Sequence, residues 1–124
     1  MKELTRAEEE IMQILWAVER GFVKDILDRM PSPKPAYNTV STIVRILEKK
    51  GFVGYKAYGK THEYFPLVSK EDYKSKLMKT VVKNYFSNSF QQMVSFFAGD
   101  KKLSVKELEE IKELMDVEIK KQKL

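Results

Sequence analysis

The sequence predicts a mainly α-helical protein with one small β-hairpin, and three observations lead to this expectation. Apolar residues recur with helical spacing along most of the 124 residues. The period changes from 3.6 to 2 only between Gly51 and Leu67, on either side of a Gly-Lys pair. Capping motifs, in which Ser or Thr is followed three residues later by Glu, occur near both ends of the chain and predict helix starts there.

Composition restricts the class of protein. The length suits one domain, or one small domain with an appendage, and the 43% apolar residues are enough for a core. The chain has no cysteine, which excludes disulfides and thiolate metal sites and suits a reducing cytosol. The first ten residues do not resemble a signal peptide, and no apolar run approaches the ~20 residues of a membrane span. We therefore expect a cytoplasmic protein without a membrane partner.

Two short helices are expected first. The Thr5 hydroxyl can accept a hydrogen bond from the Glu8 amide, while the Glu8 carboxylate accepts one from the Thr5 amide. Gly21 is a candidate stop for the helix that follows. A second apolar stripe then runs to Met30. The three prolines within residues 31–36 cannot continue a helix and predict a stiff connector. The apolar positions of the two helices are Ile11, Met12, Ile14, Leu15, Trp16 and Val18, followed by Phe22, Val23, Ile26, Leu27 and Met30.

The helix expected at residues 36–51 is two-sided. At about 100° per residue, one side is apolar and the other gathers an amide, hydroxyls, a guanidinium and an ammonium. Amides and guanidiniums pair with base edges in a major groove, whereas hydroxyls and ammoniums suit phosphate oxygens. The alternative is an ordinary amphipathic helix with a solvated face. The apolar side consists of Val40, Ile43, Val44 and Leu47, and the candidate DNA-binding residues are Asn38, Thr39, Ser41, Thr42, Arg45 and Lys49.

Residues 53–67 predict a hairpin directly after this helix. Gly59-Lys60 suits a type II′ turn between two alternating strands. Residues 34–60 contain six basic residues and one acidic residue, a net charge of +5, and such a local field attracts polyanions. Three short helices followed by a basic hairpin indicate a winged helix-turn-helix domain at residues 1–68. The hairpin's candidate DNA contacts are Lys56, Tyr58, Lys60 and His62, although a hairpin can also merely cover a core.

Residues 69–124 are expected to form a helical dimerisation region. Capping motifs begin helices at Ser69 and Ser104, and residues 99–102 read as a turn. The apolar stripes of these helices need a partner, and we expect a second copy of the chain rather than packing back onto the first domain. The candidate dimer-interface residues are Leu77, Val81, Tyr85, Phe90, Val94, Phe97, Leu108, Ile111 and Met115.

Four segments together resemble the penicillinase-repressor family of winged-helix regulators, which includes methicillin-resistance and copper-responsive repressors. They are LTRAEEEIMQILW (4–16), TVSTIVRILEKKGFV (39–53), YGKTHEYFP (58–66) and LSVKELEEIKELM (103–115). The resemblance implies a homodimer that binds a palindromic operator in double-stranded DNA and represses transcription. In the resistance branch it also implies release by a sensor-linked protease that cuts in the C-terminal region. The matching neighbourhood here includes Phe96 and Phe97 as candidate proteolysis positions.

The sequence also departs from this family. Ser41 and Ile46 stand where members often carry basic residues, and the Phe96-Phe97 pair differs from the polar-apolar pair of the resistance branch. The cysteine-rich tail of the copper-responsive branch is absent, and because Cu(I) needs soft ligands, we expect no metal or cofactor.

Two other functions are possible from the residues alone. The single histidine, His62, has no nucleophile and acid around it in a recognisable motif, so we do not expect an enzyme. The second is a winged helix that serves as a protein-interaction adaptor without operator binding. Salt-sensitive binding to a DNA duplex would distinguish the two binding functions.

Overall fold

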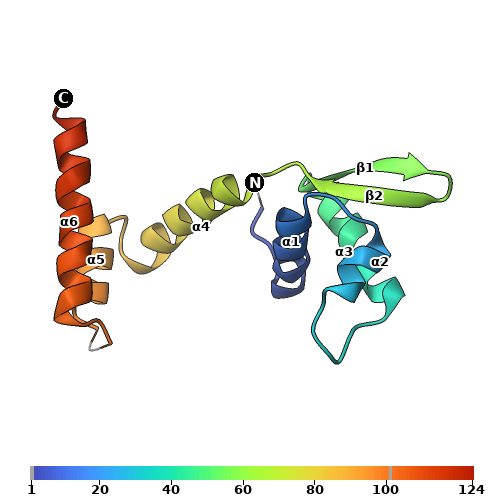
Figure 1. Cartoon of the computed structure of the whole chain (residues 1–124), viewed down its shortest axis with the longest axis horizontal. Helices are drawn as coiled ribbons and strands as arrows, with labels where there is room; N and C mark the ends of the chain where they lie inside the picture. Colours follow the sequence, from blue (N-terminus) through green and yellow to red (C-terminus); the bar gives the residue numbers. More distant parts are fainter. Residues whose placement is uncertain (1, 101) are drawn as a thin grey trace. The chain divides into compact units, whose positions relative to one another are not determined.

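The computed structural model describes residues 2–100 and 102–124, and it confirms the predicted mainly helical fold with one antiparallel hairpin (Figure 1). The chain divides into two compact units, Met1–Leu77 and Met78–Leu124. The elements are α1 (Arg6–Val18), α2 (Val23–Asp28), α3 (Tyr37–Lys49), β1 (Val53–Tyr58), β2 (Thr61–Pro66), α4 (Lys70–Tyr85), α5 (Phe90–Ala98) and α6 (Val105–Gln122).

Helix α1 begins at the predicted cap but does not end at the predicted glycine. The Thr5 hydroxyl accepts a hydrogen bond from the Glu8 amide at 3.2 Å, and the Glu8 carboxylate accepts one from the Thr5 amide at 2.8 Å. The helix stops at Glu19, which has a φ of +72°. Gly21 pairs instead with Tyr64 of β2, through hydrogen bonds of 2.9 and 2.8 Å in the two directions. The expected stop was wrong because Gly21 lies in extended backbone that pairs with the hairpin.

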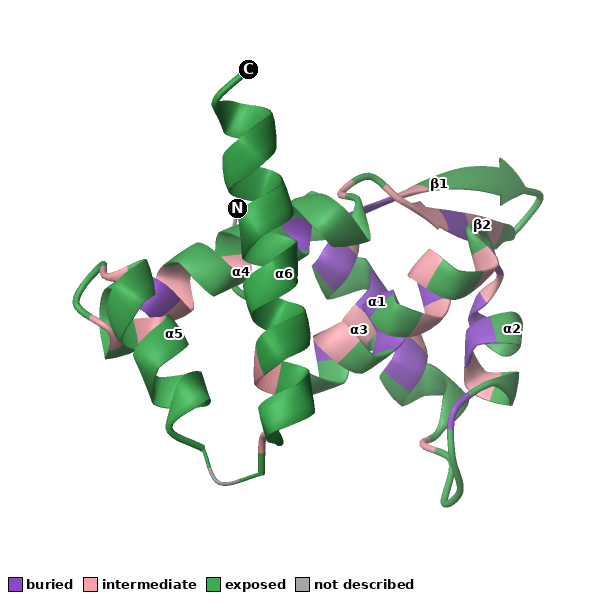
Figure 2. Cartoon of the chain, turned by 60° about the vertical axis from the view of Figure 1, so that its left-hand side comes forward, coloured by how far each residue is buried: buried purple, intermediate pink, exposed green. Residues whose placement is uncertain are grey.

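The core of the first unit lies between α1, α2, α3 and the base of the hairpin (Figure 2). Phe52, which follows α3, is its largest fully buried side chain, and the Tyr73 ring of α4 packs edge-on against it at 5.7 Å. The Tyr73 hydroxyl also accepts a hydrogen bond from the Leu4 amide at 3.0 Å. The buried set is Leu4, Ile11, Met12, Leu15, Val23, Ile26, Met30, Val40, Val44, Leu47, Phe52, Val53, Tyr64 and Tyr73.

The start of α4 therefore belongs to the first unit. Ser69 caps α4 as predicted, because its hydroxyl accepts a hydrogen bond from the Asp72 amide at 3.0 Å. The Trp16 indole donates to the Val68 carbonyl at 2.9 Å, and Leu77 packs against the core. The first compact unit consequently ends at Leu77 and the second begins at Met78, both within α4. The division into a DNA-binding domain at residues 1–68 and a dimerisation region at residues 69–124 stays a prediction.

The second unit is helical but has almost no interior. Ser89 and Ser104 cap α5 and α6, and Ser104 forms the predicted capping box with Glu107. The predicted turn at residues 99–102 includes Lys101, which lies outside the described residues; in the same turn the Lys102 amide donates to the Asp100 carboxylate at 2.9 Å. Val82 is the one buried side chain among the described residues of this unit. These helices thus expose most of their apolar residues.

No helix in the described part of the chain combines the length and the apolar character that crossing a membrane requires.

Candidate nucleic-acid interface

Helix α3 has the two faces that its sequence predicts. Val40, Val44 and Leu47 are completely buried, and Ile43 is half-buried. The opposite side exposes Asn38, Thr39, Thr42, Arg45 and Lys49, while Ser41 is half-buried. The hydroxyl of Thr42 donates to the carbonyl of Asn38 one turn earlier at 2.9 Å, so its proton is already used within the helix. The exposed face of α3 thus presents an amide, hydroxyl groups, a guanidinium and an ammonium to a partner.

The hairpin has the predicted tight turn and two distinct faces. Tyr58 pairs with Thr61 across a two-residue turn, in which Gly59 has a φ of +62°. Side chains opposite one another in an antiparallel pair lie on the same face of the sheet. The pairing places Tyr55, Ala57, His62 and Tyr64 on one face, and Lys56, Tyr58, Thr61 and Glu63 on the other.

The face with His62 carries a row of rings. The Tyr55 and His62 rings are stacked, with centroids 4.1 Å apart and planes 7° from parallel. The buried Tyr64 ring lies 6.1 Å from each of them. These contacts fix the position of the one histidine in the chain.

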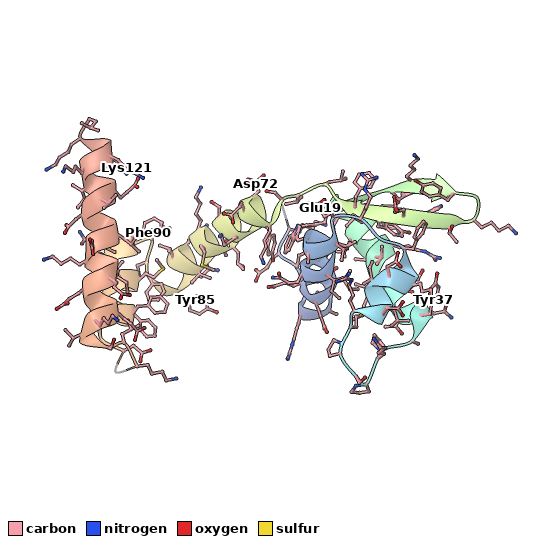
Figure 3. The ribbon with its side chains drawn as sticks, viewed as in Figure 1. Glu19, Tyr37, Asp72, Tyr85, Phe90 and Lys121 are labelled. Atoms are coloured by element: carbon pink, nitrogen blue, oxygen red, sulfur yellow. The ribbon has the colours of Figure 1, made fainter. Side chains whose placement is uncertain are left out.

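A hollow of about 590 Å³ separates α3 from this part of the hairpin. Its lining residues come from α2 with the residue before it, from α3 and from the hairpin, and five of them are predicted DNA-binding residues. Tyr37 lines it from the first turn of α3 (Figure 3). The predicted residues on the hollow are Asn38, Ser41, Arg45, Lys60 and His62, and the others are Phe22, Val23, Lys24, Asp25, Tyr37, Thr61 and Tyr64.

The remaining predicted contacts lie outside this hollow. Thr39, Thr42 and Lys49 are exposed on α3 without lining it. Lys56 and Tyr58 lie on the other face of the hairpin, where the Lys56 ammonium is 5.3 Å from the centre of the Tyr58 ring. The sequence treated the hairpin contacts as one group, but the strand pairing separates Lys56 and Tyr58 from His62.

The hollow carries more positive than negative charge. Lys24, Arg45 and Lys60 line it, and the one acidic lining residue, Asp25, accepts a hydrogen bond from the Phe22 amide at 2.9 Å. Burial raises the pKa of the Tyr64 hydroxyl, and the charge of Glu48 raises it further while that of Arg45 lowers it. The hollow can therefore accommodate a polyanion beside hydrogen-bonding side chains.

Two of the six basic residues between residues 34 and 60 have ammonium groups that are bonded within the chain. The Lys34 ammonium donates to three backbone carbonyls, and the Lys50 ammonium lies 2.7 Å from the Glu8 carboxylate. The basic stretch is consequently less available to a partner than its charge count indicates.

Sequence reasoning missed three residues of this surface. Tyr37 is half exposed and opens the exposed side of α3, directly before Asn38. Tyr55 stacks on His62, and Lys24 reaches the hollow from α2. Tyr37 could have been found from its helical spacing to Ser41, whereas Tyr55 and Lys24 depend on strand register and helix packing.

The predicted dimer-interface residues are distributed over both units. Leu77 packs on the core of the first unit, and Val81 and Leu108 are half-buried. The other predicted residues are exposed in this chain: Tyr85, Phe90, Val94, Phe97, Ile111 and Met115. Figure 3 shows Tyr85 on α4 and Phe90 on α5.

The candidate proteolysis positions lie inside a helix. Phe96 and Phe97 belong to the last turns of α5, and their exposed fractions are 62% and 52%. The two rings contact each other edge-on at 5.3 Å, and Phe96 lies 5.7 Å from Phe86.

No cluster of three or more potential metal ligands occurs among the residues that the structure describes.

Comparison with known proteins gives one family. The sequence profile of the family described as "Penicillinase repressor" matches residues 4–117. The methicillin resistance regulatory protein MecI of Staphylococcus aureus strain N315 is 29% identical over 115 residues, which cover 92% of this chain and 94% of that protein. The penicillinase repressor of Bacillus licheniformis is 22% identical over 119 residues, which cover 92% and 90% of the two chains.

A solved structure shares the fold. The solution structure of the DNA binding domain of the repressor BlaI matches with a TM-score of 0.50 and 24% sequence identity. The match covers 59% of this chain and 94% of that one, and it confirms the winged helix-turn-helix fold.

Proposed function

Because the chain belongs to the penicillinase repressor family, whose profile matches residues 4–117, we propose that it is a DNA-binding transcriptional repressor acting in the cytoplasm. Its relatives include a methicillin resistance regulator and penicillinase repressors. The observation that carries the proposal is the positively charged hollow between α3 and the hairpin, which unites Arg45 and Lys60. The function is non-catalytic, since binding and release of an operator need no bond to be broken in the DNA.

Helix α3 supplies sequence recognition in this proposal. It enters the major groove with Asn38 and Arg45 toward base edges, where an amide suits adenine and a guanidinium suits guanine. Lys49 and Ser41 contact phosphate oxygens. Thr42 already donates its proton to the Asn38 carbonyl, so it suits a thymine methyl group or a base amino group better than a phosphate. Thr39 lies at the outer edge of the same face and contacts the backbone there.

The hairpin acts as the wing. Lys60 at the tip and His62 on the hollow contact the phosphates next to the major groove that α3 occupies. Lys56 and Tyr58 lie on the opposite face of the hairpin from His62, so they contact a different stretch of the DNA backbone. The wing thereby adds affinity without reading bases directly.

A homodimer would place two winged-helix domains on one operator. The second unit buries only Val82 among its described residues, and it exposes apolar side chains along α5 and α6. A second copy of the chain is the partner proposed to cover them, because two-fold symmetric dimers match palindromic operators. Cleavage near Phe96 and Phe97 by a sensor-linked protease is the proposed release step.

The proposal is tested by selecting sequences from a pool of random duplexes with the full chain. A palindrome is expected, with half-sites about one helical turn, or a multiple of it, apart. Binding to the selected duplex should weaken steeply between about 50 and 200 mM salt, as phosphate neutralisation requires. The alternative of a protein-interaction adaptor predicts neither a selected sequence nor salt-sensitive duplex binding, and that result would overturn the proposal.

A further inference from the structure

Lys34 makes an unusual set of contacts in the connector between α2 and α3. Its ammonium donates to the backbone carbonyls of Leu27, Asp28 and Met30, at 3.0, 2.9 and 2.9 Å respectively. An ammonium has three protons, and here each has an acceptor. Lys34 is thus bound to its own chain at all of its donor positions.

These carbonyls lie at the C-terminal end of α2, which is only six residues long. The last carbonyls of a helix have no partner within the helix and carry the negative end of its dipole. A helix this short has little stability of its own. The Leu27 carbonyl also accepts a hydrogen bond from the Met30 amide at 3.1 Å, so the ammonium adds a second bond there and bonds the carbonyls of Asp28 and Met30 as well. These bonds hold the connector back against the end of α2.

The same connector sets the start of α3. Val40, Val44 and Leu47 seat α3 in the core, but its N-cap Ala36 makes no side-chain capping hydrogen bond, so the connector before it is the restraint on the first turn. Lys34 stands two residues before that N-cap. The Lys34 bonds therefore restrain the connector that leads directly into Tyr37 and Asn38, where the exposed face of α3 begins.

We propose that Lys34 is a positioning residue that aims α3 at the operator, and that it is not a phosphate ligand. This inference rests on the proposed function. A phosphate contact from Lys34 would require its three carbonyl bonds to be broken. Net charge alone would not separate the two roles, because Lys34 is one of the six basic residues between residues 34 and 60.

The test compares three variants of the full chain with the parent: Lys34→Met, Lys34→Arg and Lys60→Met. Each is titrated on the duplex that the parent selects and on a scrambled duplex, over about 50–200 mM salt. Thermal unfolding first establishes that every protein is folded at the assay temperature. Lys60→Met is the matched control, since Lys60 lines the hollow from the wing tip.

A positioning role predicts a loss of sequence preference with no change in the electrostatic contribution. Lys34→Met should bind the selected duplex about tenfold more weakly, with less loss on the scrambled duplex and an unchanged salt slope. Lys34→Arg should also lose affinity for the selected duplex, because a planar guanidinium cannot reproduce the three-way arrangement of an ammonium. Lys60→Met should lose affinity on both duplexes alike, with a slope smaller by about 0.9.

Other results would overturn the assignment. A Lys34→Met variant whose loss is equal on both duplexes, with a slope reduced by about 0.9, would show a phosphate ligand. Binding like the parent's by Lys34→Met, or full rescue by Lys34→Arg, would show that the three carbonyl bonds do not aim α3. A parent chain that selects no duplex overturns the proposed function itself, and the role of Lys34 with it.

Discussion

The ammonium of Lys50 lies 2.7 Å from the carboxylate of Glu8, which joins the end of α3 to the start of α1. Glu8 is 4% exposed, and the same carboxylate oxygen accepts the hydrogen bond from the Thr5 amide. Burial acts to raise the pKa of Glu8, but the hydrogen bonds from Lys50 and Thr5 and the charge of Lys50 outweigh it and lower the pKa below 4.5. A buried carboxylate is thus stable in its charged form because the Lys50 ammonium and the Thr5 amide both bond it.

This pair predicts a particular pH dependence of stability. A lowered folded-state pKa stabilises the protein at any pH above the ordinary value of 4.5, and this contribution is lost as the pH falls through the folded pKa. Glu8→Gln should cost about 1–3 kcal/mol at pH 7 and should lose less stability than the parent on further acidification. Urea unfolding at a series of pH values measures the loss of stability at pH 7 and its change on acidification. Glu10→Gln, on the exposed side of α1, is the control, and equal behaviour of the two variants would contradict the assignment.

Arg45 should be the main determinant of operator sequence. Arg45→Ala is expected to weaken binding to the selected duplex by about 1–3 kcal/mol if it pairs with a guanine. The free energy of unfolding should barely change, because Arg45 is exposed. Lys49→Ala is the comparison, since a phosphate contact weakens binding to all sequences and lowers the salt slope. Parental affinity of Arg45→Ala for its duplex would place the reading face elsewhere.

The proposed dimer can be tested on α5. Phe97 is 52% exposed in one chain, so a carboxylate there is tolerated in the monomer and is buried only if a partner covers the site. Phe97→Asp should therefore dissociate the dimer at micromolar concentration in analytical ultracentrifugation. Ser95→Asp, two residues earlier on another side of the helix, should leave it intact. A folded Phe97→Asp variant that stays dimeric would exclude this face.

Truncation tests the proposed release step. A chain ending at Phe96 lacks α6, whereas the buried core of the first unit lies entirely before residue 78. It should stay folded as a winged helix, become monomeric, and bind a two-half-site operator ~10²–10⁴-fold more weakly, because the second contact is no longer intramolecular. Gel-shift titration of both proteins at one salt concentration measures this. Equal affinities would exclude dimer loss as the route to derepression.

Local patterns were sufficient to predict the helices and the hairpin. The capping boxes at Thr5 and Ser104, the buried side of α3 and the turn at Gly59 each depend on residues within a few positions of one another. Contacts between distant residues could not be read in this way. Gly21 was misassigned as the stop of α1 because its pairing with Tyr64 joins residues far apart in the chain.

The candidate site shows the same limit. Helical spacing placed Asn38 and Arg45 on one face, but it could not show that the hairpin register separates Lys56 from His62. The net charge of residues 34–60 included Lys34 and Lys50, whereas the ammonium of each is bound within the first unit. A lysine's sequence position gives its charge, but only the fold shows which acceptors its ammonium can reach.

The paired hydrogen bonds between Gly21 and Tyr64 have a consequence for solubility. The outer edge of β2 would otherwise present unpaired backbone donors and acceptors to other molecules, and open strand edges invite intermolecular sheet formation. At Tyr64 both backbone groups are already occupied, at 2.8 and 2.9 Å. The chain thereby has one fewer route to aggregation through its hairpin.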